Sequence, residues 1–208
     1  MYAARMREWA MTFIETIPPE DATGLLAEHY AFDRENLGGE ANFTRAFSLQ
    51  PEVFAGWKQL NGAIKAGMDL RRYELATLAA AKRLRSSYCC LAHGTVLIEQ
   101  FDEPVRDIAI DHRAAGLDEI DVAVMDLAEK VVDDATSIGD ADLTPLRDLG
   151  LSETEIMDVV LAASVRCFFS KTLDALGVRP DATYNEMDAR LRDVLVVGRP
   201  IADAPAVA

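Results

Sequence analysis

Hydrophobic positions recur at helical spacing over most of this chain, and no segment shows the alternation typical of a β-strand. In the first half, the pattern predicts a helix from Pro51 to a break at 67–69, one over 70–84, and one from Ser86 or Ser87 to about Glu99. In the second half it predicts helices over 120–132, 140–149 and 152–176, with shorter helices after Pro19 and Pro104. The pattern therefore predicts an all-α fold.

The second half contains the clearest helix-boundary signals. Ser152 followed three residues later by Glu155 is a capping-box pattern at a helix start. Gly150 precedes this helix, and Gly177 follows its expected last turn. These signals predict a long helix between two turns.

An offset of 81 residues places several residue types of the first half onto the second. Glu74 falls on Glu155, Arg85 on Arg166, Ser86 on Cys167, Cys89 on Ser170 and His93 on Asp174. We interpret this order as an internal duplication that gives two similar helical halves, about 12–115 and 116–190, within one domain over 1–197. Only the first half carries both a thiol and an imidazole, so the second is interpreted as scaffold. Residues 198–208 are predicted to form a disordered tail.

Charge and composition exclude several classes of function. The 208 residues are 50% hydrophobic and carry a net charge of −14, with a sequence pI near 4.6. This acidity argues against nucleic-acid partners and against an anionic membrane surface. The first ten residues carry charges where a secretory signal would be apolar, and three cysteines do not suggest a disulfide framework. We therefore expect a cytoplasmic protein with reduced thiols.

The densest ionisable chemistry lies at Cys89 and His93, which are four residues apart and hence one helical turn from each other. A nearby imidazole and a helix N-terminus both favour the reactive thiolate. We expect Cys89 to be the nucleophile and His93 the base that takes its proton. The alternative is that Cys89 is a small buried hydrophobe. His29 and His112 have no such neighbours and are interpreted as surface or capping residues.

Glu74 is the carboxylate that could orient His93. It lies twelve residues before Ser86, a span of about 18 Å if the helix were straight. The chain must therefore turn near Ser86 and fold back, or a second subunit must complete the contact. The alternative is that Glu74 only favours the helix dipole.

The motif around these residues resembles that of the alkylhydroperoxidase D-like (AhpD-like), or carboxymuconolactone decarboxylase, family. That motif is Glu, eleven residues, Cys-x-x-Cys, three residues and His, and its four positions fall here on Glu74, Ser86, Cys89 and His93. The sequence is most similar to the two-copy branch called peroxidase-related proteins, and the resemblance covers about residues 12–190. It implies the helical fold of that family, with Glu74 in the active site.

The resemblance implies a thiol-dependent, peroxiredoxin-type antioxidant peroxidase in which Cys89 attacks a hydroperoxide and His93 and Glu74 relay the proton. The first cysteine of the family motif is replaced by Ser86, so an external thiol must regenerate Cys89. Whether Cys90 or Cys167 could resolve Cys89 stays open. Tyr88 is interpreted as a pocket wall or a hydrogen-bond donor, Ser86 as an N-cap or thiolate donor, and Cys90 as a core residue.

Two other functions stay open. One is a lyase acting on a muconolactone-type lactone, for which Arg85 is the nearest carboxylate-binding cation. The other is a non-redox protein that binds a small molecule. A zinc site on Glu74, Cys89 and His93 is a less favoured alternative, and we assign no metal and no cofactor. Apolar helix faces that include 159–161 and 168–169 predict a homo-oligomer.

Overall fold

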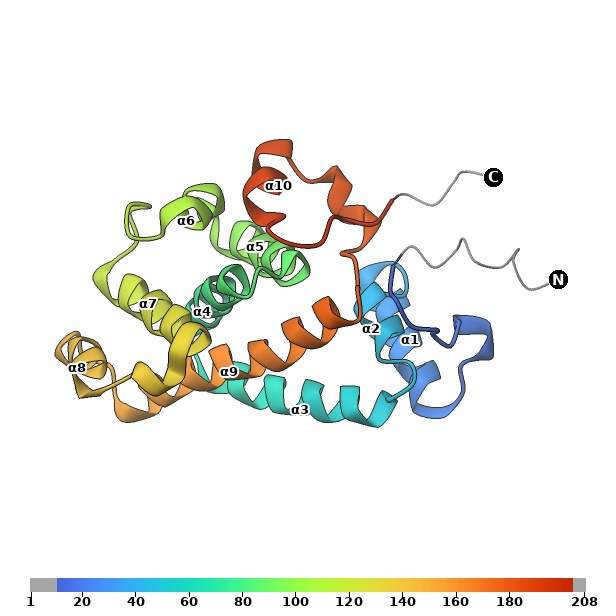
Figure 1. Cartoon of the computed structure of the whole chain (residues 1–208), viewed down its shortest axis with the longest axis horizontal. Coiled ribbons are helices and arrows are strands. Elements are labelled where there is room, and N and C mark those ends of the chain that lie inside the picture. The colour runs from blue at the N-terminus through green and yellow to red at the C-terminus, as the bar shows by residue number, and fades with distance from the viewer. Residues whose placement is uncertain (1–10, 204–208) are drawn as a thin grey trace.

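The fold is a cluster of helices built around one central helix, in a computed structural model that describes residues 11–203 (Figure 1). Every regular element within that range is helical. The α-helices are α1 (Gly24–Leu37), α2 (Asn42–Ala46), α3 (Pro51–Gly67), α4 (Leu70–Arg83), α5 (Ser87–Phe101), α6 (Val105–Asp111), α7 (Glu119–Asp134), α8 (Asp140–Asp148), α9 (Glu153–Ala175) and α10 (Ala189–Leu195). The predicted all-α class is therefore confirmed. In the part of the chain that the structure describes, no helix combines the length and hydropathy needed to span a membrane.

Helix α4 is the centre of the core. It packs against α5, α7 and α9, and its nine consecutive residues from Tyr73 to Ala81 are all buried (Figure 1). A helix buried on every side needs small residues wherever a neighbour approaches closely. Ala76, Ala79, Ala80 and Ala81 meet that need. Their small side chains bring the backbones of three neighbouring helices close to α4.

The chain reverses between α4 and α5 in a short turn. Arg85 adopts a left-handed backbone conformation with φ of 56°, and the backbone N–H of Ser86 donates to the Ala81 carbonyl at 2.9 Å. Ser86 is the N-cap residue of α5, although its side chain makes no capping hydrogen bond. This turn folds α5 back along α4, so Glu74 and His93 meet within one chain and need no second subunit.

Helix α9 runs alongside α3 and contacts α4 and α7 (Figure 1). The predicted capping box at its start is confirmed, because Ser152 Oγ accepts from the Glu155 N–H at 3.3 Å and Glu155 Oε2 accepts from the Ser152 N–H at 2.8 Å. The offset of 81 residues aligns this single helix with two helices and a turn in the first half. The structure therefore does not show the predicted duplication.

The C-terminal segment differs from the expectation of a tail that is disordered from residue 198. Residues 198–203 instead make hydrogen bonds, from Gly198 N to Ser87 Oγ at 2.8 Å and from Ala202 N to the Pro180 carbonyl at 2.8 Å. Their Gly/Pro-rich composition forms no helix, but their backbone donors still find acceptors on the body of the protein. Residues 204–208 lie outside the described residues. The sequence analysis also did not predict α10.

Two interpretations of surface residues also change. His29 and His112 are buried rather than exposed: His29 contacts the Pro51 carbonyl at 3.2 Å, and His112 contacts Asp126 at 2.8 Å. Of the apolar residues expected at an oligomer interface, Val159 and Phe169 belong to the core of this chain, whereas Phe168 is exposed. The homo-oligomer stays a prediction.

Gly198 is packed so closely that we predict a cost for any side chain there. A Cβ atom at this position would overlap the carbonyl oxygen of Arg85. Replacing Gly198 with alanine should lower the free energy of unfolding by about 1–3 kcal/mol, because the backbone must shift. Urea unfolding checks this value.

Gly62 provides the matched control because it lies inside α3 with no atom within 4 Å of a built Cβ. Gly62→Ala should raise the free energy of unfolding by about 0.5–1 kcal/mol through helix propensity. Equal effects of the two substitutions would contradict the close approach at Gly198.

Candidate active site

Glu74 and His93 form a hydrogen-bonded unit between α4 and α5. His93 Nδ1 lies 2.5 Å from Glu74 Oε2, and Lys65 Nζ donates to Glu74 Oε1 at 2.9 Å. Burial opposes ionisation of Glu74, but the hydrogen bonds from His93 and Lys65 outweigh it and lower the pKa of that carboxyl. Glu74 is therefore a carboxylate that holds His93 in a fixed orientation.

His93 is held in the form that can act as a base. Burial and the nearby Arg166 charge lower the pKa of the imidazole, although Glu74 opposes them. The ring is therefore neutral near pH 7, and Nδ1–H donates to Glu74. In that tautomer Nε2 carries the free lone pair.

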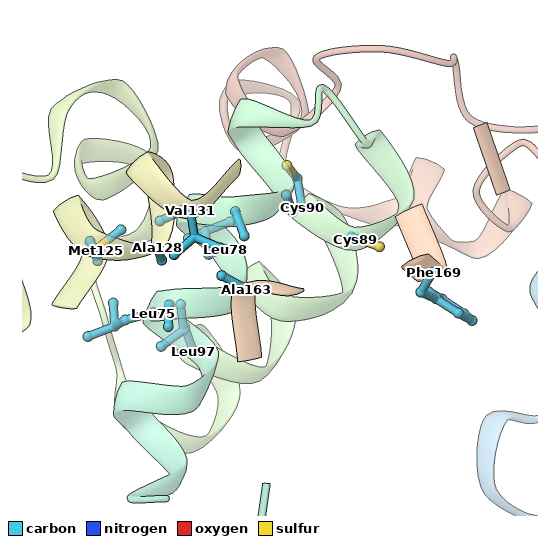
Figure 2. Close-up of a cluster of buried hydrophobic side chains, with 14 of the residues drawn as sticks. Leu75, Leu78, Cys89, Cys90, Leu97, Met125, Ala128, Val131, Ala163 and Phe169 are labelled. Atoms are coloured by element: carbon cyan, nitrogen blue, oxygen red, sulfur yellow. The ribbon is translucent and has the colours of Figure 1, made fainter. Parts of the chain in front are cut away.

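Cys89 lies in the first turn of α5 and is only 3% exposed. Its Sγ accepts a hydrogen bond from Ser170 Oγ at 3.1 Å and lies 3.7 Å from Nη1 of Arg166. Figure 2 shows the Cys89 sulfur pointing toward Phe169 of α9, while the Cys90 sulfur points in another direction. Both partners of the Cys89 sulfur come from α9, so the thiol belongs to the α5–α9 contact.

Arg166 is a buried cation with no carboxylate partner. It is 3% exposed, and among residues 11–203 no acidic oxygen lies within 4.0 Å of its guanidinium group. Nη2 donates to the Tyr73 hydroxyl at 3.3 Å, and that hydroxyl donates to Asn61 at 2.7 Å. Burial opposes the charge, yet Cys89 and Tyr73 raise the pKa of Arg166 above its usual value. A buried cation needs a counter-charge, and the Cys89 sulfur is the adjacent group that can supply one.

Cys89 and His93 lie one turn apart on α5 but are not joined by a direct hydrogen bond. Within the described part of the chain, the structure shows no hydrogen bond between the Cys89 sulfur and the His93 ring. Arg166 acts on both groups, because it contacts the sulfur and its charge lowers the pKa of the imidazole. A proton passing from Cys89 to His93 therefore needs a bridging group, such as a bound substrate or a water molecule.

The hydroxyls of Tyr88 and Ser86 do not bond to the sulfur. Tyr88 donates its hydroxyl to Asp181, and burial raises the pKa of Tyr88. Ser86 is completely buried, and its Oγ makes no hydrogen bond of normal geometry. Tyr88 therefore supports the position of Cys89 through packing rather than through a hydrogen bond.

The other two cysteines are poor nucleophiles. Burial raises the pKa of both the Cys90 and the Cys167 thiols. Neither forms a disulfide with Cys89, since all three cysteines are free. Cys89 is the thiol that contacts a buried cation, and it is therefore the candidate nucleophile of the site.

Sequence reasoning missed Arg166, Ser170 and Lys65. The offset of 81 residues aligned Arg166 with Arg85 and Ser170 with Cys89, but both were interpreted as scaffold. Their spacing of four residues did place them on one face of a helix. Arg166, rather than Arg85, is the cation beside the thiol, while Arg85 Nε donates to the Val197 carbonyl at 3.3 Å.

We predict that Arg166 controls the reactivity of Cys89. Arg166→Met should slow alkylation of Cys89 by iodoacetamide at pH 7 by about tenfold or more, because the sulfur loses its stabilising charge. Peptide mass spectrometry reports the rate at Cys89 separately from Cys90 and Cys167. Arg83→Met, which removes an exposed cation paired with Asp133, should leave the rate unchanged. An unchanged rate in folded Arg166→Met would contradict the role of Arg166.

The lowered pKa of His93 also predicts a pH dependence of stability. Between that lower pKa and the usual 6.5, the unfolded chain binds a proton that the folded chain does not. Stability should therefore fall as the pH drops through 6.5. From pH 7.5 to 5.5, the advantage of wild type over His93→Asn should shrink by about 1 kcal/mol. Urea unfolding across that range measures it. A constant difference would show that His93 gains no proton on unfolding.

Comparison with known proteins places the fold. No protein-family model matches this sequence. No curated protein matches it either. The structure of the AhpD core of an uncharacterized peroxidase-related protein from Ralstonia eutropha JMP134 superposes with a TM-score of 0.77 and 16% identity, over 93% of this chain and 98% of that chain.

Two further solved structures are similar. An uncharacterized peroxidase-related protein from Silicibacter sp. TM1040 gives a TM-score of 0.74 and 20% identity, over 84% of this chain and 94% of that chain. A cysteine-to-alanine variant of the debrominase Bmp8, in complex with 2,3,4-tribromopyrrole, gives 0.68 and 13%, over 88% of this chain and 96% of that chain. At such identities the likeness establishes the fold, and this chain has the AhpD-like helical fold.

Proposed function

We propose that this protein is a thiol-dependent peroxidase that reduces hydroperoxides through Cys89. The observation that carries the proposal is the pairing of the Cys89 sulfur with the buried guanidinium of Arg166, which has no carboxylate partner within the described residues. This arrangement favours a thiolate, and the thiolate is the form of cysteine that attacks an O–O bond. The similarity to peroxidase-related proteins supports the same class of reaction.

The proton relay follows from the state of His93. Neutral Nε2 takes the proton of the Cys89 thiol through the bound hydroperoxide or a water molecule, and Glu74 stabilises the imidazolium that forms. The thiolate then attacks the terminal oxygen of the hydroperoxide, which forms an S–O bond and breaks the O–O bond. His93 returns the proton to the departing alkoxide. One thiol and one hydroperoxide thus give one sulfenic acid and one alcohol.

Regeneration of Cys89 uses an external thiol. Ser86 occupies the position three residues before Cys89, and neither Cys90 nor Cys167 is bonded to it. One thiol condenses with the sulfenic acid to form a mixed disulfide and water. A second thiol attacks the mixed disulfide and releases the Cys89 thiol. The two external thiols leave together as a small-molecule disulfide.

A second candidate is thiol-dependent dehalogenation, and the similarity to a debrominase favours it. The thiolate of Cys89 would remove bromine from an aromatic carbon as a sulfenyl bromide, and a proton would replace it on the ring. An external thiol would then release bromide and form a disulfide. The two candidates share the nucleophile and the reductant but differ in the atom that the sulfur attacks.

The two are separated by one experiment on the intact chain. With one equivalent of cumene hydroperoxide and dimedone present, wild type should gain a dimedone adduct at Cys89, detected by mass spectrometry. Cys89→Ser should gain none, and His93→Ala should form the adduct at least about 100-fold more slowly. Cys167→Ala, which removes the partly exposed thiol, should react like wild type.

Absence of the adduct in wild type, with Cys89 still open to alkylation, would overturn the peroxidase proposal. Release of bromide from 2,3,4-tribromopyrrole under the same conditions would then support the dehalogenase. Neither product would leave a protein that binds a small molecule without redox turnover.

A further inference from the structure

An open cavity lies beside the turn that precedes α5. Its volume is about 410 Å³, and it is lined by Leu84, Arg85, Asp174, Gly198, Arg199 and Pro200. None of these residues belongs to the Cys89–His93 site. The cavity is formed where the turn after α4, the end of α9 and the C-terminal segment meet.

The cavity is lined by two cations, Arg85 and Arg199, and by one acid, Asp174. Neither Arg85 nor Arg199 has an acidic oxygen within 4.0 Å in the described part of the chain. Arg199 uses Nε and Nη2 on the Asp174 backbone carbonyl, at 3.1 and 2.7 Å, and Arg85 uses only Nε, on Val197. Two guanidinium groups thus keep free N–H donors in a protein whose net charge is −14. Unused, forked donors of this kind match a carboxylate.

One acidic side chain, Asp174, lies in the lining. Burial raises the pKa of its carboxyl, while the Ser86 hydroxyl and the Arg199 charge oppose that effect. The Asp174 carboxyl lies more than 4.0 Å from both guanidinium groups, so it forms no salt bridge that would occupy their free donors.

The backbone around this cavity is strained at one residue and closely packed at another. Arg85 has φ of 56°, a left-handed conformation that is strained for a residue with a side chain. Gly198 lies so close to the Arg85 carbonyl that no side chain fits there, and its N–H donates to Ser87 Oγ at 2.8 Å. The strain and the close approach together set where the Arg85 side chain leaves the backbone.

The cavity lies one helical turn from the thiol along both helices. On α9, Asp174 follows Ser170, the partner of the Cys89 sulfur, by four residues, or about 6 Å. On α5, Ser86 precedes Cys89 by three residues, or about 4.5 Å. A ligand whose carboxylate sits between Arg85 and Arg199 could therefore reach Cys89 with a short chain.

We propose that this cavity binds the carboxylate of the external thiol that regenerates Cys89. The reductant would be a small mercaptocarboxylate. Held in this cavity, its thiol would do the work of the cysteine that Ser86 replaces. This inference rests on the proposed peroxidase function. The bound thiol attacks the sulfenic sulfur, forms the S–S bond and releases water, and a second mercaptocarboxylate then exchanges with the mixed disulfide.

The kinetic experiment separates the two half-reactions. Cys89 is first oxidised with one equivalent of cumene hydroperoxide and then mixed with 3-mercaptopropionate or with neutral 2-mercaptoethanol. Loss of the sulfenic acid is followed by quenched-flow mass spectrometry, with rates normalised to thiolate concentration. In wild type, the sulfenic acid should be lost about tenfold faster with 3-mercaptopropionate than with 2-mercaptoethanol. This factor is what one charge-assisted hydrogen-bond pair contributes.

The variants test whether the cavity causes that preference. Arg85→Asn and Arg199→Gln should each remove most of it while leaving sulfenic acid formation unchanged. Asparagine suits the left-handed conformation at position 85, so that variant should fold. Arg190→Gln, which removes an exposed cation outside the cavity, is the matched control and should keep the preference. A preference that is absent in wild type, or that survives in both cavity variants, would overturn the inference.

A binding measurement keeps this inference separate from the peroxidase proposal. Calorimetry with 3-(methylthio)propionate, a thioether that cannot reduce Cys89, should show binding to wild type and at least about tenfold weaker binding to Arg85→Asn. If no sulfenic acid forms in wild type, the peroxidase proposal fails, and this measurement still decides whether the carboxylate site exists. Equal binding to both proteins, or none to wild type, would overturn the site.

Discussion

The core of this fold encloses a positive charge, Arg166, that has no carboxylate partner in the described part of the chain. Arg166 lies inside the protein with Tyr73 and the Cys89 sulfur as its polar partners. Removing a guanidinium group from water costs several kcal/mol unless an anion compensates. The chain has 35 aspartates and glutamates, yet its described part places no acidic oxygen within 4.0 Å of Arg166. The Cys89 sulfur lies beside this charge instead, and for that reason the proposed function places the reaction there.

That pairing is possible only because helices approach one another closely at the core. The alanine-rich face of α4 allows α5 and α9 to pack on the same central helix, which brings Cys89 of α5 against Ser170 of α9. Glu74 lies on α4 itself and reaches His93 across the α4–α5 contact. The two polar units thus occupy adjacent helix contacts and communicate through the charge of Arg166 rather than through a direct hydrogen bond.

Sequence patterns predicted the helices better than they predicted the site. Periodicity and capping signals are local, so the helix begun by Ser152 and the helices around Cys89 could be recognised from neighbouring residues alone. The pairing of Arg166 with Cys89 depends on how two helices that are distant in sequence pack together. Arginine is also common on solvated helix faces, so its presence alone does not indicate a buried site. The contact between Glu74 and His93 could be predicted only in part. The spacing implied either a turn near Ser86 or a contact from a second subunit, and it could not decide between the two. The left-handed Arg85 that makes the reversal has no sequence signature, since glycine or asparagine would be the expected residue there.

The left-handed backbone at Arg85 also separates the candidate thiol from the proposed reductant site. The residues on its α5 side lead to Cys89, which is nearly inaccessible, whereas its own side chain lines an open cavity with Arg199. A resolving cysteine at position 86 would serve as both the second thiol and its own attachment to the protein. With Ser86 there instead, the proposed function divides those two tasks: a diffusible thiol would bring the sulfur, and the fixed cations Arg85 and Arg199 would supply the attachment. A small binding energy would be enough for this purpose, because a thiol held one helical turn from the sulfenic acid would react locally rather than in a bimolecular encounter.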